Sequence, residues 1–144
     1  MNAVAQLAAI GILASLAAGG SWLLRTPPAP PQPFACDPTA IAEDEICLAD
    51  VAEGALWVDA RPRADWERNG VTGSILWNFD PAEDAGKFER DAAMQIIGAP
   101  QVVVYCGSEA CGTSRQIADR IRRLDLGPPV KVLYGGWDAL KDSN

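Results

Sequence analysis

The chain has 144 residues, enough for one domain of ordinary size. Hydrophobic residues make up 49% of the sequence and charged residues 22%, so the chain is neither a disordered polymer nor a multi-span membrane protein. There are 12 Lys+Arg against 19 Asp+Glu, and the resulting net charge of −7 argues against nucleic acid as a partner. The absence of histidine excludes Ser-His-Asp and Cys-His catalysis and His-ligated zinc.

The first 24 residues are predominantly apolar, and the first charged side chain is that of Arg25. As a helix, residues 3–24 would extend about 33 Å, which is enough to cross the hydrocarbon core of a bilayer. A cleaved signal peptide is the main alternative. No basic residue precedes the apolar stretch, however, and the stretch is longer than the apolar core of a usual signal. We therefore expect residues 1–24 to form a single-pass transmembrane anchor.

Residues 25–35 contain five prolines and predict a stiff, extended linker. The remaining residues, 36–144, are the right length for one compact domain. The side of the membrane on which this domain lies stays open. Arg25 next to the span favours the cytoplasm, whereas a proline-rich spacer followed by the Cys36 and Cys47 pair favours the other side.

Short apolar runs alternate with helical patterns along the domain. In chain order, the sequence predicts a strand at residues 56–58, a helical turn at 64–68, a strand at 74–77, a helix within 84–97, a strand at 101–105, a helix at 113–126 and a strand at 130–134. This alternation predicts an α/β fold with a mostly parallel sheet flanked by helices.

Cys106 is the strongest candidate for chemistry. It follows the most clearly defined strand and precedes a helix, and ligands of open α/β sheets gather at the carboxyl ends of strands. The dipole and the unpaired N–H groups of a helix N-terminus favour an anion, so they lower the pKa of a nearby thiol without help from a histidine. The alternative is that Cys106 is a small hydrophobic residue of the core.

Three segments resemble the rhodanese family: residues 56–66 (LWVDARPRADW), residues 70–75 (GVTGSI), and residues 102–107 (VVVYCG) taken together with residues 130–137 (VKVLYGGW). The resemblance implies that Cys106 opens a cradle-shaped loop and carries sulfane sulfur as a persulfide, without a cofactor. It also implies that Asp59 and Arg61 support the fold and the loop. The loop residues are Gly107, Ser108, Glu109, Ala110, Cys111 and Gly112.

The sequence departs from the family pattern in the loop. The usual loop of the family has six residues and leads directly into the helix. Here the helical pattern begins near Thr113 or Ser114, so the loop is expected to be about two residues longer than usual. Rhodanese-like phosphatases need an arginine six positions after the cysteine, but Gly112 stands there, which argues against a phosphatase. Glu109 and the absence of a basic loop residue disfavour a dianionic donor such as thiosulfate.

The other cysteines have two readings each. Cys111 could resolve a persulfide or sulfenic acid on Cys106 by closing a disulfide, or it could simply lie in the core. Cys36 and Cys47 could form a disulfide in an oxidising compartment, or remain thiols in a reducing one. The spacing of the four cysteines lacks the close pairs typical of zinc sites, so we expect no metal.

The first hypothesis is a membrane-anchored sulfurtransferase that moves sulfur through Cys106 from a small donor to a thiol acceptor or a persulfide-bearing protein. The second is a thiol-disulfide or sulfur-carrier module that uses Cys106 and Cys111. The third is a non-catalytic domain whose loop binds a partner.

Overall fold

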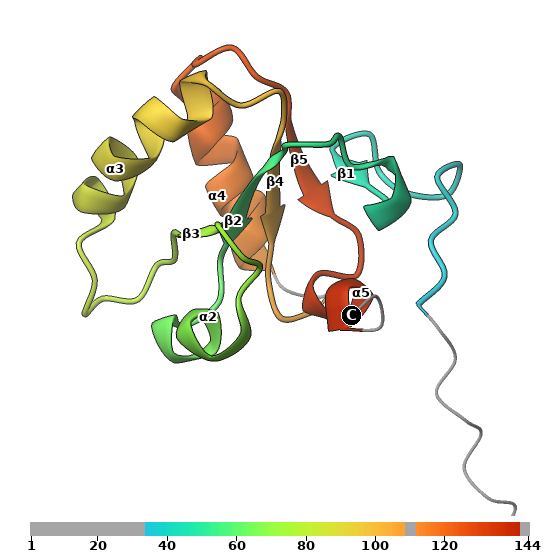
Figure 1. Cartoon of the computed structure of the whole chain (residues 1–144), viewed down its shortest axis with the longest axis horizontal. Coiled ribbons are helices and arrows are strands. Elements are labelled where there is room, and N and C mark those ends of the chain that lie inside the picture. Colours follow the sequence, from blue (N-terminus) through green and yellow to red (C-terminus); the bar gives the residue numbers. More distant parts are fainter. Residues whose placement is uncertain (1–33, 109–111, 142–144) are drawn as a thin grey trace, which may run out of the picture. The chain divides into compact units, whose positions relative to one another are not determined.

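The computed structural model describes residues 34–108 and 112–141. These residues form a five-stranded sheet in which every neighbouring pair of strands is parallel, in the order β1-β5-β4-β2-β3 (Figure 1). The strands are β1 (Glu45–Ile46), β2 (Leu56–Asp59), β3 (Ile75–Leu76), β4 (Val102–Tyr105) and β5 (Val130–Leu133). The predicted α/β fold with a parallel sheet is therefore confirmed.

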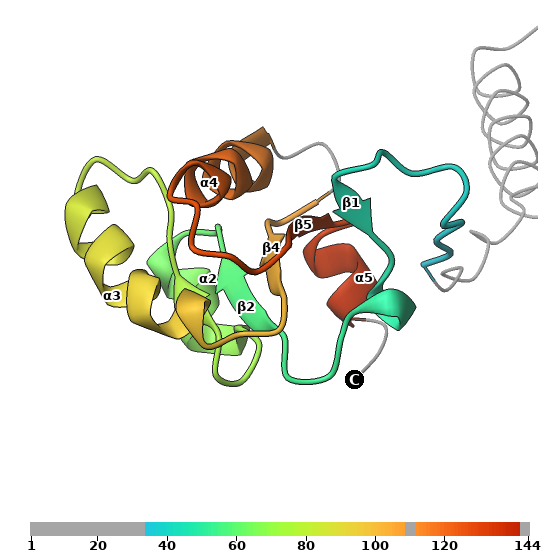
Figure 2. The ribbon, with the colours of Figure 1, turned by 90° about the horizontal axis from the view of Figure 1, so that it is seen from above.

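Helices cover both faces of the sheet, and Figure 2 shows α4 and α5 on opposite sides of it. The helices are η1 (Leu48–Asp50), α2 (Arg63–Asn69), α3 (Ala85–Ile97), α4 (Gly112–Arg123) and α5 (Trp137–Lys141). One core cluster joins α3 and α4 to the sheet, and a second joins η1 and α5 to the other face. All four residues of β4 are fully buried because the strand is covered on both faces.

The elements predicted from apolar patterns are all present. The helix α3 begins where the Asp84 side chain accepts a hydrogen bond from the Lys87 N–H, an N-cap that ends the preceding loop. In α4, the apolar stripe Ile117, Ala118 and Ile121 is the buried face of the helix, as its spacing predicted. The strand β3 is shorter than the predicted 74–77, but the Trp77 N–H still donates to the Asp59 carbonyl at 3.0 Å.

The helix after Cys106 begins earlier than predicted. It starts at Gly112 rather than at Thr113, because a glycine weakens the helical pattern of a sequence without preventing the helix. Six residues, 106–111, therefore precede α4, so the prediction of a loop longer than that of the family was wrong.

The same helix ends at Arg123, three residues before the predicted end. Leu124 and Asp125 donate to carbonyls three residues back, and Asp125 has a φ of 51°, which turns the chain out of the helix. Leu124 and Leu126 nevertheless pack against the core, so the apolar pattern continued past the last helical turn. The short elements β1, η1 and α5 were not predicted, because two to five residues carry too little periodicity.

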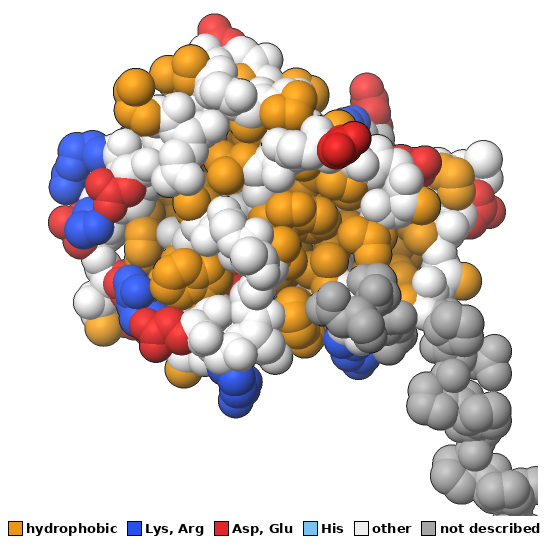
Figure 3. Space-filling view, in the orientation of Figure 1, with side chains coloured by type: hydrophobic (Ala, Val, Ile, Leu, Met, Phe, Trp, Pro, Cys, Tyr) orange, Lys and Arg blue, Asp and Glu red, His pale blue; other side chains and the backbone are white. Residues whose placement is uncertain are grey.

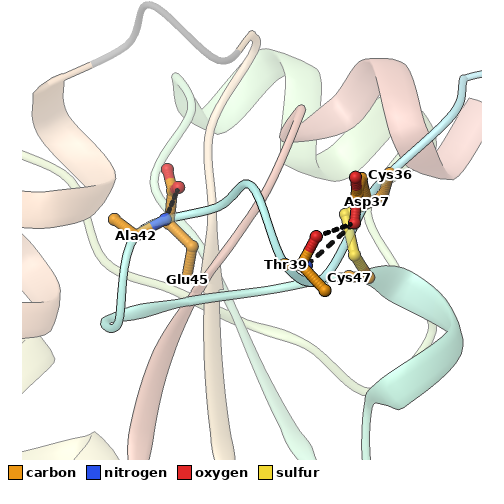
Figure 4. The surroundings of a disulfide bond; sticks show 6 residues. All are labelled: Cys36, Asp37, Thr39, Ala42, Glu45 and Cys47. Carbon is orange, nitrogen blue, oxygen red and sulfur yellow. Dashed lines mark hydrogen bonds between the residues drawn. A yellow bond between two sulfur atoms is a disulfide. The ribbon is translucent and has the colours of Figure 1, made fainter.

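A disulfide joins Cys36 to Cys47, with their Cα atoms 5.7 Å apart (Figure 4). It ties the entry segment of the domain to the end of β1, the strand at one edge of the sheet. Beside it, the Asp37 carboxylate accepts hydrogen bonds from the backbone and the hydroxyl of Thr39. The cross-link thus closes a short loop, which limits the freedom of the unfolded chain.

No helix within residues 34–108 and 112–141 is long and apolar enough to cross a bilayer. The predicted span at residues 3–24 and nearly all of the predicted linker at 25–35 lie outside the described residues. Both therefore stay predictions.

Candidate active site

The carboxyl ends of β2, β3 and β4 meet at one edge of the sheet and surround a cavity of about 490 Å³. A cavity at this edge is where open α/β sheets bind ligands, and its volume suits a small molecule. Its lining comes from the loops after the three strands and from the first turn of α4: Ala60, Pro62, Asn78, Phe79, Asp80, Pro81, Cys106 and Thr113. A second cavity of about 220 Å³ lies near α2 and α3 and has no cysteine in its lining.

Cys106 lines this cavity, and its backbone is fixed by a hydrogen bond. Only 6% of the residue is exposed, and its carbonyl accepts a 2.7 Å hydrogen bond from the Trp137 N–H at the start of α5. The turn before α5 can approach this closely because Gly136 has no side chain. A Cβ at Gly136 would lie 2.6 Å from the Cys106 carbonyl oxygen, and its φ of +56° is left-handed. The glycine therefore fixes where the loop backbone leaves β4.

The first turn of α4 reaches the same cavity through Thr113. The N–H groups of a first helical turn have no acceptor within their own helix, and the helix dipole favours negative charge there. A position of this kind generally favours the thiolate of a reduced cysteine. In the structure Cys106 is disulfide-bonded. A reductant must therefore open this bond before Cys106 can act as a nucleophile.

A buried charge network lies next to the cysteine. Arg61 donates from Nε and Nη2 to the Asp59 carboxylate, with the shortest distance 2.7 Å, and the two residues are 4% and 0% exposed. The Tyr105 hydroxyl donates to the same carboxylate at 2.6 Å, and its oxygen accepts the Val71 N–H at 3.1 Å. The Arg61 guanidinium also stacks on the Trp137 ring, 4.1 Å from its centroid. The network links the ends of β2 and β4 to α5.

Two groups of this network have shifted pKa values. Burial acts to lower the pKa of Arg61, but its hydrogen bonds and charge attraction with Asp59 outweigh burial and raise it. Burial, aided by the bond to Asp59, raises the pKa of Tyr105 to about 12. The arginine therefore stays charged and the phenol stays neutral at physiological pH.

The raised pKa of Tyr105 predicts alkaline destabilisation. Above pH 10 the unfolded chain loses the phenolic proton while the folded chain keeps it, so the free energy of unfolding falls between pH 10 and pH 12. The expected loss in the free energy of unfolding from Tyr105 is about 2 kcal/mol at pH 12, and no loss from this group is expected below pH 10. Urea unfolding at stepped pH should show a shallower decline in Tyr105→Phe than in the parent. Parallel declines would contradict the assignment, whatever the stability of the variant at neutral pH.

The structure places the predicted site residues in three groups. Cys106 lines the cavity, with Gly107 and Ser108 exposed after it and Gly112 at the start of α4. Asp59 and Arg61 do not line the cavity but lie in the buried network beside it. Glu109, Ala110 and Cys111 lie outside the described residues. Cys36 and Cys47 form their disulfide near β1, the edge strand separated from β4 by β5.

Sequence reasoning missed the loop after β3, which supplies half of the cavity lining: Asn78, Phe79, Asp80 and Pro81. Asn78 donates to the Arg61 carbonyl at 3.1 Å and accepts the Asp80 N–H at 3.0 Å, so it holds this loop against the end of β2. The same rule that pointed to Cys106 could have found these residues, since they also follow the carboxyl end of a predicted strand.

The sequence profile described as "Rhodanese-like domain" matches residues 45–143, more than half of the chain. The chain belongs to the rhodanese-like domain family. The matched residues include all five strands, the loop that starts at Cys106 and the helix α4. No curated protein is similar enough to count as a relative of this chain.

Two solved structures are similar to this chain. The BH2092 protein from Bacillus halodurans is 22% identical, with a TM-score of 0.54 over 69% of this chain and 73% of that one. The N-terminal domain of a putative ATP/GTP binding protein from Clostridium difficile 630 is 16% identical, with a TM-score of 0.49 over 69% of this chain and 97% of that one. At this level of identity the similarity to the BH2092 protein supports the fold alone.

Proposed function

We propose that this rhodanese-like domain is a sulfurtransferase that carries sulfane sulfur as a persulfide on Cys106. The observation that carries the proposal is the shared cavity of Cys106 and the first turn of α4 at the carboxyl edge of the sheet. A thiolate at that position is a nucleophile that needs no histidine, in keeping with a sequence that has none.

The reaction has two transfers after a thiol reductant opens the disulfide at Cys106. The Cys106 thiolate attacks the outer sulfur of a donor persulfide, the donor S–S bond breaks, and the donor leaves as a thiolate. Cys106 then carries the persulfide. An acceptor thiolate attacks the outer sulfur of that persulfide, takes it, and regenerates the Cys106 thiolate. Each step exchanges one S–S bond for another, so no external oxidant is consumed.

A second candidate function is a thiol-disulfide or sulfur-carrier module. The observation that favours it is that Cys106 is disulfide-bonded. Cys111 is the cysteine of the sequence that remains once Cys36 and Cys47 are paired. In this function the Cys111 thiolate would attack the Cys106 sulfur of a persulfide, a disulfide would form between the two cysteines, and the outer sulfur would leave as hydrosulfide.

We also propose that residues 1–24 anchor the domain in a membrane on its oxidising side. The apolar stretch at residues 3–24 supports an anchor, and the disulfide between Cys36 and Cys47 supports an oxidising compartment. Alkylation of intact cells with a membrane-impermeant maleimide, after mild reduction, tests the side. Labelling of Cys36 is expected, and protection until the membrane is permeabilised would place the domain in the cytoplasm.

Intact-protein mass spectrometry separates the candidate functions. The reduced chain is incubated with an organic persulfide and then desalted. A gain of about 32 Da mapped to Cys106 supports sulfur transfer, because one sulfur atom is added. A loss of about 2 Da that needs both Cys106 and Cys111 supports the thiol-disulfide module. If neither change is observed, both candidate functions are overturned and a non-catalytic binding domain remains.

A further inference from the structure

The cavity next to Cys106 has an unusual balance of charge for a site that handles sulfur anions. Among the described residues that line it, Asp80 is the one with a carboxyl or amine group, and none of them is a lysine or arginine. Four of the lining residues are apolar, including Phe79, which is 42% exposed. The Asp80 side chain is exposed and accepts the Ala82 N–H at 2.9 Å.

The arginines nearest in sequence to the cavity wall are already engaged. Arg61 is buried against Asp59, and Arg63 donates to both carboxylate oxygens of Glu83, at 2.6 and 2.8 Å. Figure 3 shows that Lys and Arg side chains over α2 and α3 lie next to Asp and Glu side chains. Neither arginine is among the residues that line the cavity at Cys106. An anionic donor would therefore meet the Asp80 carboxylate without a compensating cation from the lining.

The geometry points to Asp80 and Phe79 as residues that set donor specificity: the cavity takes an organic sulfane-sulfur compound with a short carbon skeleton and a positively charged amino group. This inference rests on the proposed function of Cys106. The Asp80 carboxylate attracts the ammonium group, and the apolar wall with the exposed face of Phe79 receives the carbon chain. The chemistry is that of an aminothiol persulfide, whereas inorganic thiosulfate carries two negative charges.

Thiol-disulfide exchange measures this preference without any assumption about persulfides. The full chain carries Cys111→Ser, so that Cys106 stays available as a thiol while Cys36 and Cys47 remain joined. The probes are cystamine, bis(2-hydroxyethyl) disulfide and dithiodiglycolate, which are cationic, neutral and anionic at similar size. The Cys106 thiolate attacks one sulfur, a mixed disulfide forms, and one probe thiolate leaves. Peptide mass spectrometry follows the mixed disulfide on Cys106.

At low ionic strength the cationic probe should react about tenfold faster than the anionic one, because Asp80 adds to the negative charge of the whole chain. In Asp80→Asn the ratio should fall to about threefold. The matched control is Glu53→Gln, which removes the same charge from an exposed residue before β2, at the opposite edge of the parallel sheet. This control should leave the ratio within about 20% of the parent.

Equal ratios in Asp80→Asn and Glu53→Gln would overturn the inference, because only the net charge would then matter. A second arm follows the gain of about 32 Da on Cys106 with thiosulfate and with cysteamine persulfide. Cysteamine persulfide should load Cys106 faster, and Asp80→Lys should reverse the preference. Failure of both donors with the exchange ratio intact would overturn the sulfurtransferase function but not the charge selectivity. Loading by thiosulfate as fast as by cysteamine persulfide would overturn the selectivity but not the function.

Discussion

Replacing Cys106 with serine should abolish transfer of sulfur from an organic persulfide to a thiol acceptor. A serine hydroxyl forms neither a thiolate nor a persulfide, so the covalent intermediate is lost even though the side chain has nearly the same shape. We expect the rate to fall by three orders of magnitude or more, equivalent to about 4 kcal/mol or more of transition-state stabilisation. The measurement is acceptor persulfide formed per unit time from the reduced chain.

The control for this variant is Cys111→Ser, which also removes one thiol from the loop but leaves Cys106. This variant should still gain about 32 Da on Cys106. It should no longer show the loss of about 2 Da that accompanies a disulfide between Cys106 and Cys111. If Cys106→Ser retained transfer, or if Cys111→Ser lost it equally, Cys106 would not be the sulfur carrier. Thermal unfolding of both variants should confirm a folded domain, because serine is close to cysteine in size and the Cys106 backbone carbonyl can still accept the Trp137 N–H.

The sequence predicted the parts of the fold that have strong local patterns. Val102, Val103 and Val104 form a β-branched run that is typical of a strand, and they are fully buried. Ile117, Ala118 and Ile121 repeat at helical spacing and face the core. Cys106 was placed at the end of a strand and before a helix by the same logic, which needs only neighbours in sequence.

The rest of the site depends on contacts between residues far apart in the chain, which periodicity cannot reveal. Trp137 donates its N–H to the Cys106 carbonyl and stacks on Arg61, across 31 and 76 residues of sequence. Tyr105 looked like one more apolar strand residue, yet its hydroxyl donates to Asp59. Asp80 has no distinguishing pattern in the sequence, and its place in the cavity beside Cys106 depends on the fold of the loop after β3.

Replacing Arg61 with methionine should be the most destabilising of the substitutions considered at this site. The variant leaves the Asp59 carboxylate in a position with 0% exposure, without the three side-chain hydrogen bonds that Arg61 donates to it. Breaking a buried ion pair by removing one partner costs about 3–5 kcal/mol, because a buried charge is left uncompensated. Urea unfolding at pH 7 should show that loss in the free energy of unfolding, with Arg61→Lys as a milder variant that keeps the charge without the planar fork.

The matched control is Arg63→Met, which breaks the pair with Glu83 in a place where the Arg63 side chain is 46% exposed. That loss should be below about 1 kcal/mol, because water screens and replaces an exposed pair. The double variant Asp59→Asn with Arg61→Met should be more stable than Arg61→Met alone, since it buries no unpaired charge. If Arg61→Met and Arg63→Met lost the same stability, or if the double variant were the less stable, the Asp59–Arg61 pair would not be what holds the ends of β2 and β4 to α5 beside Cys106.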